Sequence, residues 1–193
     1  MSILSTRQQC LIASILVFLI VATRGHHFES LNNLPGASWA VFFLAGVYLR
    51  SVIGFAALLV LTWILDYTAI VYGGVSSFCV TPAYVFLLPA YGSLWFAGRW
   101  YVHRYRFAWP SLLPLAGALL VGAVLCELFS GGGFYFFSGR YDAPSVSEFG
   151  QRLLVFFPSY LRSLFIYVAV AAVAHTLIVL AQGPQRATRT TGV

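Results

Sequence analysis

The fold of this chain is decided by the stretch at residues 52–71, which reads VIGFAALLVLTWILDYTAIV. Its length and composition are those of a helix that crosses a bilayer, which needs roughly 20 mainly apolar residues. The stretch is nearly continuous hydrocarbon except for Asp66 and Tyr67. Because a charged residue within a membrane is costly and usually functional, the same stretch predicts both a membrane span and a candidate site.

The rest of the chain has a similar composition. Of its 193 residues, 60% are hydrophobic and 8% are charged, whereas a soluble domain typically has about 25% charged residues. A soluble core of this size cannot bury so much apolar surface, so the surplus must face lipid. We therefore expect one transmembrane domain over residues 1–193, without an internal repeat.

Apolar runs separated by short polar segments predict six membrane-spanning helices, and so an all-α bundle. The fourth run opens with Thr81 and Pro82, which are favoured at the N-cap and at the first helical position. Loops are expected over residues 24–33 and, rich in glycine and aromatic residues, over residues 130–150. The expected spans are Ile3–Thr23, Pro35–Tyr48, Val52–Val71, Thr81–Trp100, Ser111–Phe129 and Ser159–Gln182.

Two contacts between helices can also be expected from the sequence. Ala118 and Gly122 form a small-xxx-small face in the fifth span, which permits close packing against a neighbouring helix. His175 lies among alanines in the sixth span. A hydrogen bond to another helix is a more natural role for this histidine than ligand binding.

The basic residues predict the orientation in the membrane. All 11 are arginines, and they lie at the ends of the apolar runs. With six spans both termini lie on one side, which carries most of the arginines, and the positive-inside rule places that side in the cytoplasm. The arginines do not gather on one polar segment, so the lipid bilayer is the expected partner and nucleic acid is not. The cytoplasmic arginines are Arg7, Arg50, Arg99, Arg104, Arg106, Arg186 and Arg189.

In this topology the unusual polar residues fall on the outer side. Asp66 lies about 8 Å below the outer end of its helix at the helical rise. Such a cluster is typical of the mouth of a binding cavity. Each member also has a structural alternative: Asp66 as a cap inside the bundle, Arg152 as a headgroup anchor, and the histidines as solvated loop residues. The candidate binding residues are His26, His27, Asp66, Tyr67, Tyr84, Tyr135 and Arg152, with Glu127 as a weaker one.

Cys79 is the candidate for chemistry. It precedes the expected N-terminus of the fourth helix, whose positive dipole end favours the ionised thiolate. A thiolate beside a cavity is a nucleophile or a soft metal ligand, and the alternative is a loop cysteine without a role. The sequence contains no G-x-S-x-G, no H-E-x-x-H and no Walker loop. We therefore expect no bound nucleotide and no ATP hydrolysis by a P-loop mechanism.

Three segments resemble the BtuM family of small bacterial cobalamin transporters. They are Leu65-Asp66-Tyr67, the stretch at residues 76–84 that contains Cys79, and the pair His26-His27. This family is related to the S-components of energy-coupling factor systems. The resemblance covers essentially the whole chain in length and helix count. It implies a six-helix S-component-like bundle in the bacterial inner membrane, both termini in the cytoplasm, an outward-facing cobalamin pocket, and Cys79 as a ligand of the cobalt.

One feature departs from the wider S-component pattern. Many S-components carry an A-x-x-x-A face on the first helix for docking the energising module, whereas Ala13 is followed by Val17 here. This favours a solitary transporter over one that needs an energy-coupling factor module.

A sulfur ligand on cobalt would also weaken the bond opposite it, so loss of the cyanide of cyanocobalamin is an expected accessory reaction.

The residues leave three other functions open. They are a transporter of another vitamin or of haem, a membrane enzyme that uses Cys79 as its nucleophile, and a structural subunit that binds no ligand.

Overall fold

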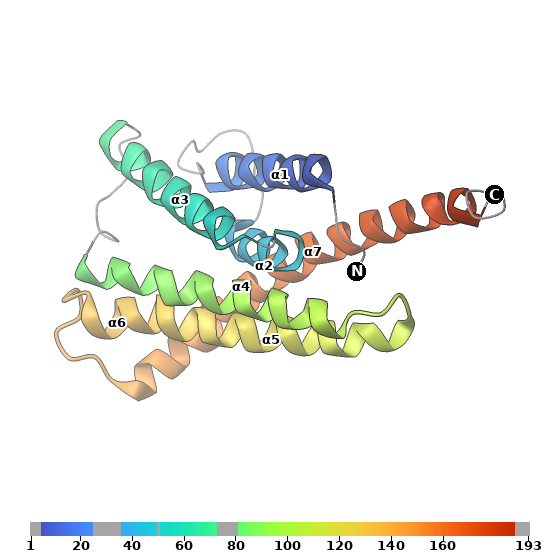
Figure 1. The fold of residues 1–193 in the computed structure, drawn as a ribbon. Coiled ribbons are helices and arrows are strands. Elements are labelled where there is room, and N and C mark those ends of the chain that lie inside the picture. The colour runs from blue at the N-terminus through green and yellow to red at the C-terminus, as the bar shows by residue number, and fades with distance from the viewer. Residues whose placement is uncertain (1–4, 25–35, 50, 73–80, 188–193) are drawn as a thin grey trace.

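The computed structural model describes residues 5–24, 36–49, 51–72 and 81–187, and across these ranges the chain is helical and without strands. Figure 1 shows the long helices running side by side in a bundle, with α1 and α3 on one side of α2 and with α4 and α5 on the other. The helices are α1 (Thr6–Arg24), α2 (Ser38–Tyr48), α3 (Val52–Tyr72), α4 (Leu87–Arg104), α5 (Leu112–Glu127), α6 (Gly133–Phe137) and α7 (Val146–Ala187).

Among the described residues, four segments are long and apolar enough to cross a membrane. They are Thr6–Arg24, Val52–Tyr72, Trp109–Phe137 and Val146–Ala181. Their outward surfaces carry large apolar side chains, such as those of Phe18, Ile53 and Leu113, which are exposed. Exposure of so many apolar groups to water would be unfavourable by roughly 25 cal/mol per Å². The chain is therefore an integral membrane protein, as its composition predicted.

The second and the fourth of the six expected spans are not among these four segments, and the second has a different character. α2 has only 11 residues, which measure about 16 Å at the helical rise and fall short of a hydrocarbon core roughly 30 Å thick. Every residue from Ala40 to Gly46 is buried, and α2 packs against α1, α4 and α7. This helix is apolar because it forms the centre of the bundle, and the sequence pattern alone does not distinguish that role from a membrane span.

The backbones of α2 and α4 approach each other closely at two glycines. A Cβ atom on Gly46 would overlap the carbonyl oxygen of Trp95, and one on Gly98 would overlap the carbonyl oxygen of Phe43. Only glycine lets the two backbones approach this closely. The expected small-residue face of α5 is confirmed, because Ala118 is buried and a Cβ on Gly122 would lie 2.9 Å from the Cβ of Ala97 on α4.

The loop expected over residues 130–150 is mostly helical, and that prediction is wrong. α5 continues through a π-helical turn, Leu128–Gly132, into α6, and α7 begins at Val146 and continues past Pro158. The glycines that suggested a loop give room to aromatic rings, since Gly132 lies against Phe149 and Gly133 against Phe86. Packing of these rings outweighs the poor helix propensity of glycine.

Two further helix boundaries position the site. α1 ends at Arg24 rather than at Thr23, so this arginine belongs to the helix and not to the expected loop. A 3-10 turn, Pro82–Phe86, precedes α4, with Thr81 at its N-cap and Pro82 at its first position as predicted, although the Thr81 hydroxyl makes no capping hydrogen bond.

The ends of several helices gather at one end of the bundle, on the left in Figure 1. They are the last turns of α1 and α3, the start of α4, the whole of α6 and the start of α7. We name this end the Asp66 end. The connection between α4 and α5 lies at the opposite end.

Candidate functional site

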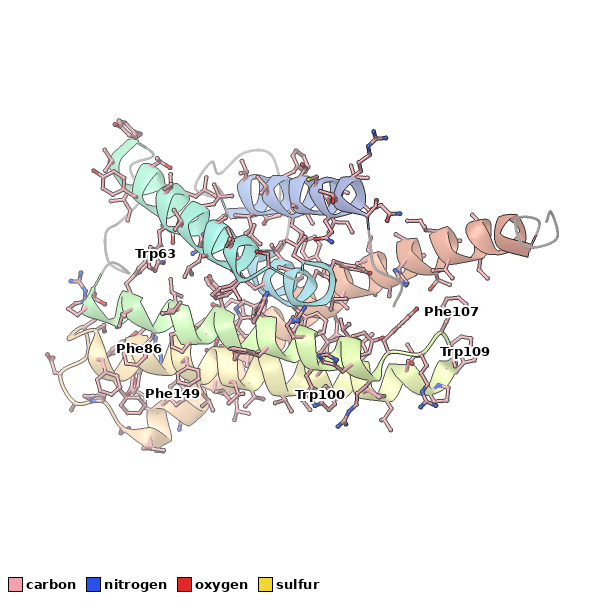
Figure 2. The ribbon with its side chains drawn as sticks, in the orientation of Figure 1. Trp63, Phe86, Trp100, Phe107, Trp109 and Phe149 are labelled. Carbon is pink, nitrogen blue, oxygen red and sulfur yellow. The ribbon has the colours of Figure 1, made fainter. Side chains whose placement is uncertain are left out.

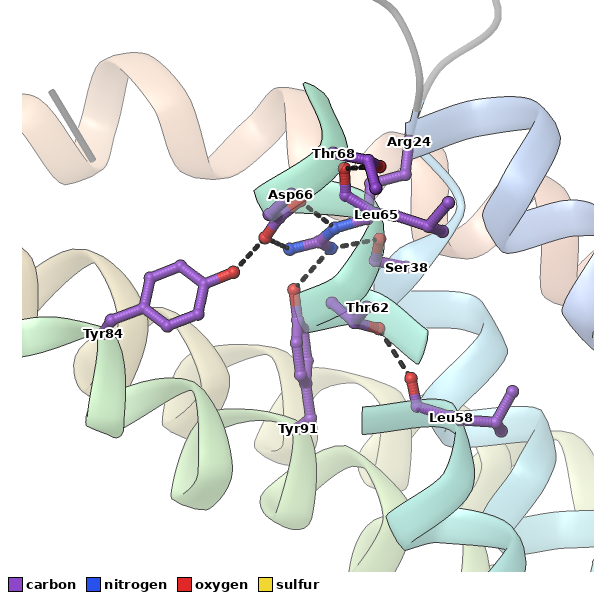
Figure 3. Close-up of polar contacts among 9 residues, drawn as sticks. All are labelled: Arg24, Ser38, Leu58, Thr62, Leu65, Asp66, Thr68, Tyr84 and Tyr91. Atoms are coloured by element: carbon purple, nitrogen blue, oxygen red, sulfur yellow. Dashed lines mark hydrogen bonds and ion pairs between the residues drawn. The ribbon is translucent and has the colours of Figure 1, made fainter. Parts of the chain in front are cut away.

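The Asp66 end contains a cluster of five polar side chains, which we name the Arg24 cluster: Arg24, Ser38, Asp66, Tyr84 and Tyr91 (Figure 3). The guanidinium of Arg24 binds the Asp66 carboxylate through two hydrogen bonds, with Nε to Oδ1 at 2.6 Å and Nη2 to Oδ2 at 2.7 Å. Such bidentate, charge-assisted pairs are the strongest hydrogen bonds that side chains form. Asp66 therefore lies opposite a matched cation inside the bundle.

The remaining groups of the cluster complete the hydrogen bonding of this pair. Nη1 of Arg24 donates to the Ser38 hydroxyl and to the Tyr91 hydroxyl, both at 2.9 Å. The Tyr84 hydroxyl donates to Oδ2 of Asp66. One guanidinium thus connects α1, α2, α3 and α4, while the carboxylate also holds the 3-10 turn that carries Tyr84. The cluster ties together the helices that meet at this end.

Local structure explains why these side chains converge. Arg24 is the last residue of α1 and Ser38 the first of α2, so both point into the same junction. The ring of Tyr91 stacks on that of Phe42, with centroids 4.2 Å apart and planes 7° apart, which holds its hydroxyl toward Arg24. The side chains of Arg24 and Asp66 are 16% and 24% exposed, so the ion pair is largely but not completely enclosed.

The structure brings together two of the predicted binding residues, Asp66 and Tyr84, in this cluster. Tyr67 is not part of it, and its side chain is 65% exposed. Arg24, Ser38 and Tyr91 were not predicted. A usable signal was present in the sequence, because an arginine that ends one apolar run and an aspartate near the end of another have complementary charges at the same membrane depth.

Arg152 and Tyr135, two other predicted residues, contact each other in a second group with Tyr141, which we name the Arg152 cluster. The Arg152 guanidinium donates to the Tyr141 hydroxyl at 2.8 Å. Its Cζ atom lies 5.5 Å from the ring centre of Tyr135 and 4.9 Å from that of Tyr141. This is the geometry of a cation held against aromatic faces. It positions α6 on the first turns of α7.

Aromatic packing connects the two clusters. Phe86, at the end of the turn that carries Tyr84, stacks on Phe137 of α6 with ring centroids 5.2 Å apart. Tyr135 and Phe149 stack at 5.8 Å, and Figure 2 shows Phe86 and Phe149 at this same end of the bundle. The Arg24 and Arg152 clusters are therefore parts of one continuous structure at the Asp66 end.

Glu127 is buried where α5 passes into the π-helical turn. Its carboxyl group covers the backbone of Gly131, where a Cβ atom would overlap Oε1. Among the described residues it has neither a hydrogen bond nor an ion pair. Single π-helical turns are frequent at functional sites, so Glu127 belongs to the candidate site more clearly than its sequence position suggested.

Cys79, His26 and His27 lie outside the described residues. In the sequence Cys79 is two residues before Thr81, with which the described chain resumes next to the Arg24 cluster. Across the described ranges, no group of three histidine, cysteine or acidic side chains is arranged to hold a metal ion.

Comparison with known proteins adds no relative to this description. No protein-family model matches the sequence, and no curated protein matches it.

Proposed function

We propose that this chain is a polytopic membrane transporter that takes up cobalamin across the bacterial inner membrane, binding it at the Asp66 end. The observation that carries this proposal is the Arg24 cluster, in which four apolar helices bring a hydrogen-bonded ion pair to one end of the bundle. Cys79, two residues before Thr81 in the sequence, is the residue that we propose as the ligand of cobalt. In the same proposal, His26 and His27 lie at the mouth of the pocket.

The chemistry of the Asp66 end suits a large ligand rimmed by amides. The partial exposure of Arg24 and Asp66 leaves donors and acceptors that can exchange partners with ligand amides. Trp63 is also partly exposed, and its ring centre lies 6.5 Å from that of Tyr84. Figure 2 shows Trp63 at this end. Flat apolar side chains with a few placed polar groups are the usual composition of a small-molecule site.

The orientation also agrees with uptake. In Figure 1 the start of α1 and the end of α7 lie toward the end that holds the α4–α5 connection, away from Asp66. With the arginine-rich end in the cytoplasm, the Asp66 end faces outward. The chain has no nucleotide-binding motif and no Ala pair at residues 13 and 17. We therefore propose transport without a dedicated energy-coupling factor module.

The proposed reaction at cobalt needs no oxidant or reductant. Binding removes the proton of the Cys79 thiol, and the sulfur takes the lower axial position of cobalt, where it displaces the nitrogen of the vitamin's own base. Electron donation by sulfur weakens the cobalt–cyanide bond on the opposite face. Cyanide then leaves with its electron pair and, with the thiol proton, forms hydrogen cyanide, while cobalt keeps its oxidation state.

The absorption spectrum of the bound corrinoid tests this function. Purified protein incubated with cyanocobalamin and washed is expected to stay red, with a spectrum shifted from that of the free vitamin. Cys79→Ala is expected to abolish the shift and to weaken binding on the order of tenfold or more. Cys79→Ser is not expected to restore it, because a hydroxyl is a poorer donor, and Cys10→Ala serves as the matched control.

Other outcomes would replace the proposal. A wild-type spectrum in both Cys79 variants would exclude sulfur ligation and make His26 or His27 the next candidates. A protein that retains haem, seen by its Soret band, but retains no corrinoid would be a haem carrier instead. Protein that stays colourless with both ligands would favour a structural subunit.

Labelling of single cysteines tests the topology. In a background without native cysteines, Ala143→Cys in the connection between α6 and α7 is expected to react with an impermeant maleimide added outside. His103→Cys, at the end of α4, is expected to react only after the membrane is opened. Both positions are exposed. The reverse pattern would place the Asp66 end in the cytoplasm and contradict an outward-facing pocket.

A further inference from the structure

A pocket of about 400 Å³ lies at the end opposite the Asp66 end, between α2, α5, α7 and the connection from α4 to α5. Its walls are mainly apolar, with Leu44 and Val47 from α2, Leu115 from α5, and Val168 and Ala172 from α7. The proposed uptake function makes no use of this pocket, which lies on the other side of the bundle from the Arg24 cluster.

The polar side chains inside this pocket bind one another. The Tyr105 hydroxyl and His175 Nε2 are 3.1 Å apart. His175 thus has a hydrogen-bond partner across the bundle as expected, but that partner is the residue directly after α4 and not part of a helix. The Tyr48 ring lies 5.9 Å from the His175 ring and closes the same side. Because this pair is already hydrogen-bonded, the interior suits a hydrocarbon ligand better than a polar one.

The rim of the pocket carries a cation. Arg106 lines it, together with Trp109, whose side chain is 86% exposed. The backbone of Arg106 is held at the start of α5, where its N–H donates to the Ser111 hydroxyl at 2.8 Å and its carbonyl accepts from the same hydroxyl. Among the described residues, the Arg106 guanidinium has no hydrogen bond and no ion pair. An anion could therefore bind it without displacing a partner.

The surroundings of Arg106 favour an anion as well. All four acidic side chains of the described ranges, those of Asp66, Glu127, Asp142 and Glu148, belong to the Asp66 end. Arg99 and Arg104 share the second half of α4 with the pocket but lie against Trp95 and Trp100, with Cζ 5.7 and 4.4 Å from the ring centres. No described carboxylate at this end competes for Arg106.

We propose that this pocket binds one anionic phospholipid of the adjacent leaflet, with its phosphate on Arg106 and an acyl chain along the apolar wall between α2 and α7. The occupant follows from the two halves of the pocket, because a rim cation needs an anion and the apolar interior needs hydrocarbon. Basic pockets between membrane helices bind acidic headgroups for this reason. Trp109 has the position of an aromatic residue at the headgroup level.

Competitive lipid retention tests the proposal on the full chain in detergent, without corrinoid, so its result is independent of the uptake proposal. The protein is incubated with equal amounts of dioleoyl phosphatidylglycerol and dioleoyl phosphatidylcholine, passed through a desalting column, and measured by native mass spectrometry. The wild type is expected to retain phosphatidylglycerol about fivefold more than phosphatidylcholine. Arg106→Gln should remove this preference. Arg104→Gln should keep it, because Arg104 packs on Trp100 in the wild type.

A second variant tests the apolar wall. Ala172→Phe places a ring in the pocket and is expected to reduce retention of both lipids by a similar factor. If Arg106→Gln does not fold, the loss of lipid retention in Ala172→Phe still tests whether a lipid occupies this pocket. Equal retention of both lipids by the wild type, or a preference that persists in Arg106→Gln, would overturn the proposal. Binding of inorganic phosphate that prevents retention of phosphatidylglycerol would show a simple anion site and would overturn it too.

Discussion

Arg24→Leu is expected to destabilise the protein by about 3 kcal/mol and to abolish retention of cyanocobalamin. The substitution leaves the Asp66 carboxylate without its cation at the junction of four helices, and breaking a largely buried ion pair costs this much because one charge is left uncompensated. The 16% and 24% exposure of the two side chains places the expected loss at the low end of the usual range. Thermal unfolding in detergent and the retained corrinoid spectrum measure the two effects separately.

The reciprocal variant and the double variant separate structure from binding. Asp66→Leu alone is expected to have a similar cost, since it leaves the guanidinium unpaired. Arg24→Leu with Asp66→Leu should recover most of the lost stability, because neither charge remains, while ligand retention stays lost. Tyr84→Phe is the mild control, removing one hydrogen bond to Asp66 at a cost of about 1 kcal/mol. Normal cyanocobalamin retention in a stable double variant would remove the Arg24 cluster from the binding site.

Gly98→Ala is expected to lower the free energy of unfolding by about 3 kcal/mol or more, which is at least as much as loss of the ion pair. The new Cβ would overlap the carbonyl oxygen of Phe43, and neither backbone can yield without separating α2 from α4. Overpacking of a well-packed core typically costs 1–3 kcal/mol even where flexible side chains absorb the strain. The yield of monodisperse protein and its unfolding midpoint are the measurements.

Gly92→Ala is the matched control on the same helix. A Cβ at Gly92 meets nothing within 4 Å, and alanine in a helix is favoured over glycine by up to about 1 kcal/mol. Gly92→Ala is therefore expected to be neutral or slightly stabilising. Similar losses in both variants would mean that the glycines act through helix propensity, and the proposed backbone contact between α2 and α4 would be wrong.

The sequence by itself determined the features that depend on local composition and spacing. An apolar stretch as long as residues 52–71 predicts a membrane helix because burial of its side chains in lipid does not depend on the rest of the chain. The cost of a charge in that stretch singled out Asp66 as a candidate site residue or as a cap inside the bundle, and the structure shows it hydrogen-bonded there, with Tyr84 as one partner. The pair Thr81 and Pro82 predicted a helical start, because their preferences follow from their own backbone geometry.

The tertiary structure alone decided which residues meet across the bundle and which apolar or glycine-rich segments are helical core. α2 has the apolar composition of a span, but the other helices surround it. Gly131 to Gly133 have the propensity of a loop, but packing of Phe86 and Phe149 holds that segment in a helix. Arg24 meets Asp66 across 42 positions of sequence, and Gly98 meets the backbone of Phe43. Such contacts depend on how distant helices pack, and the energy of that packing is not present in any one segment of the sequence.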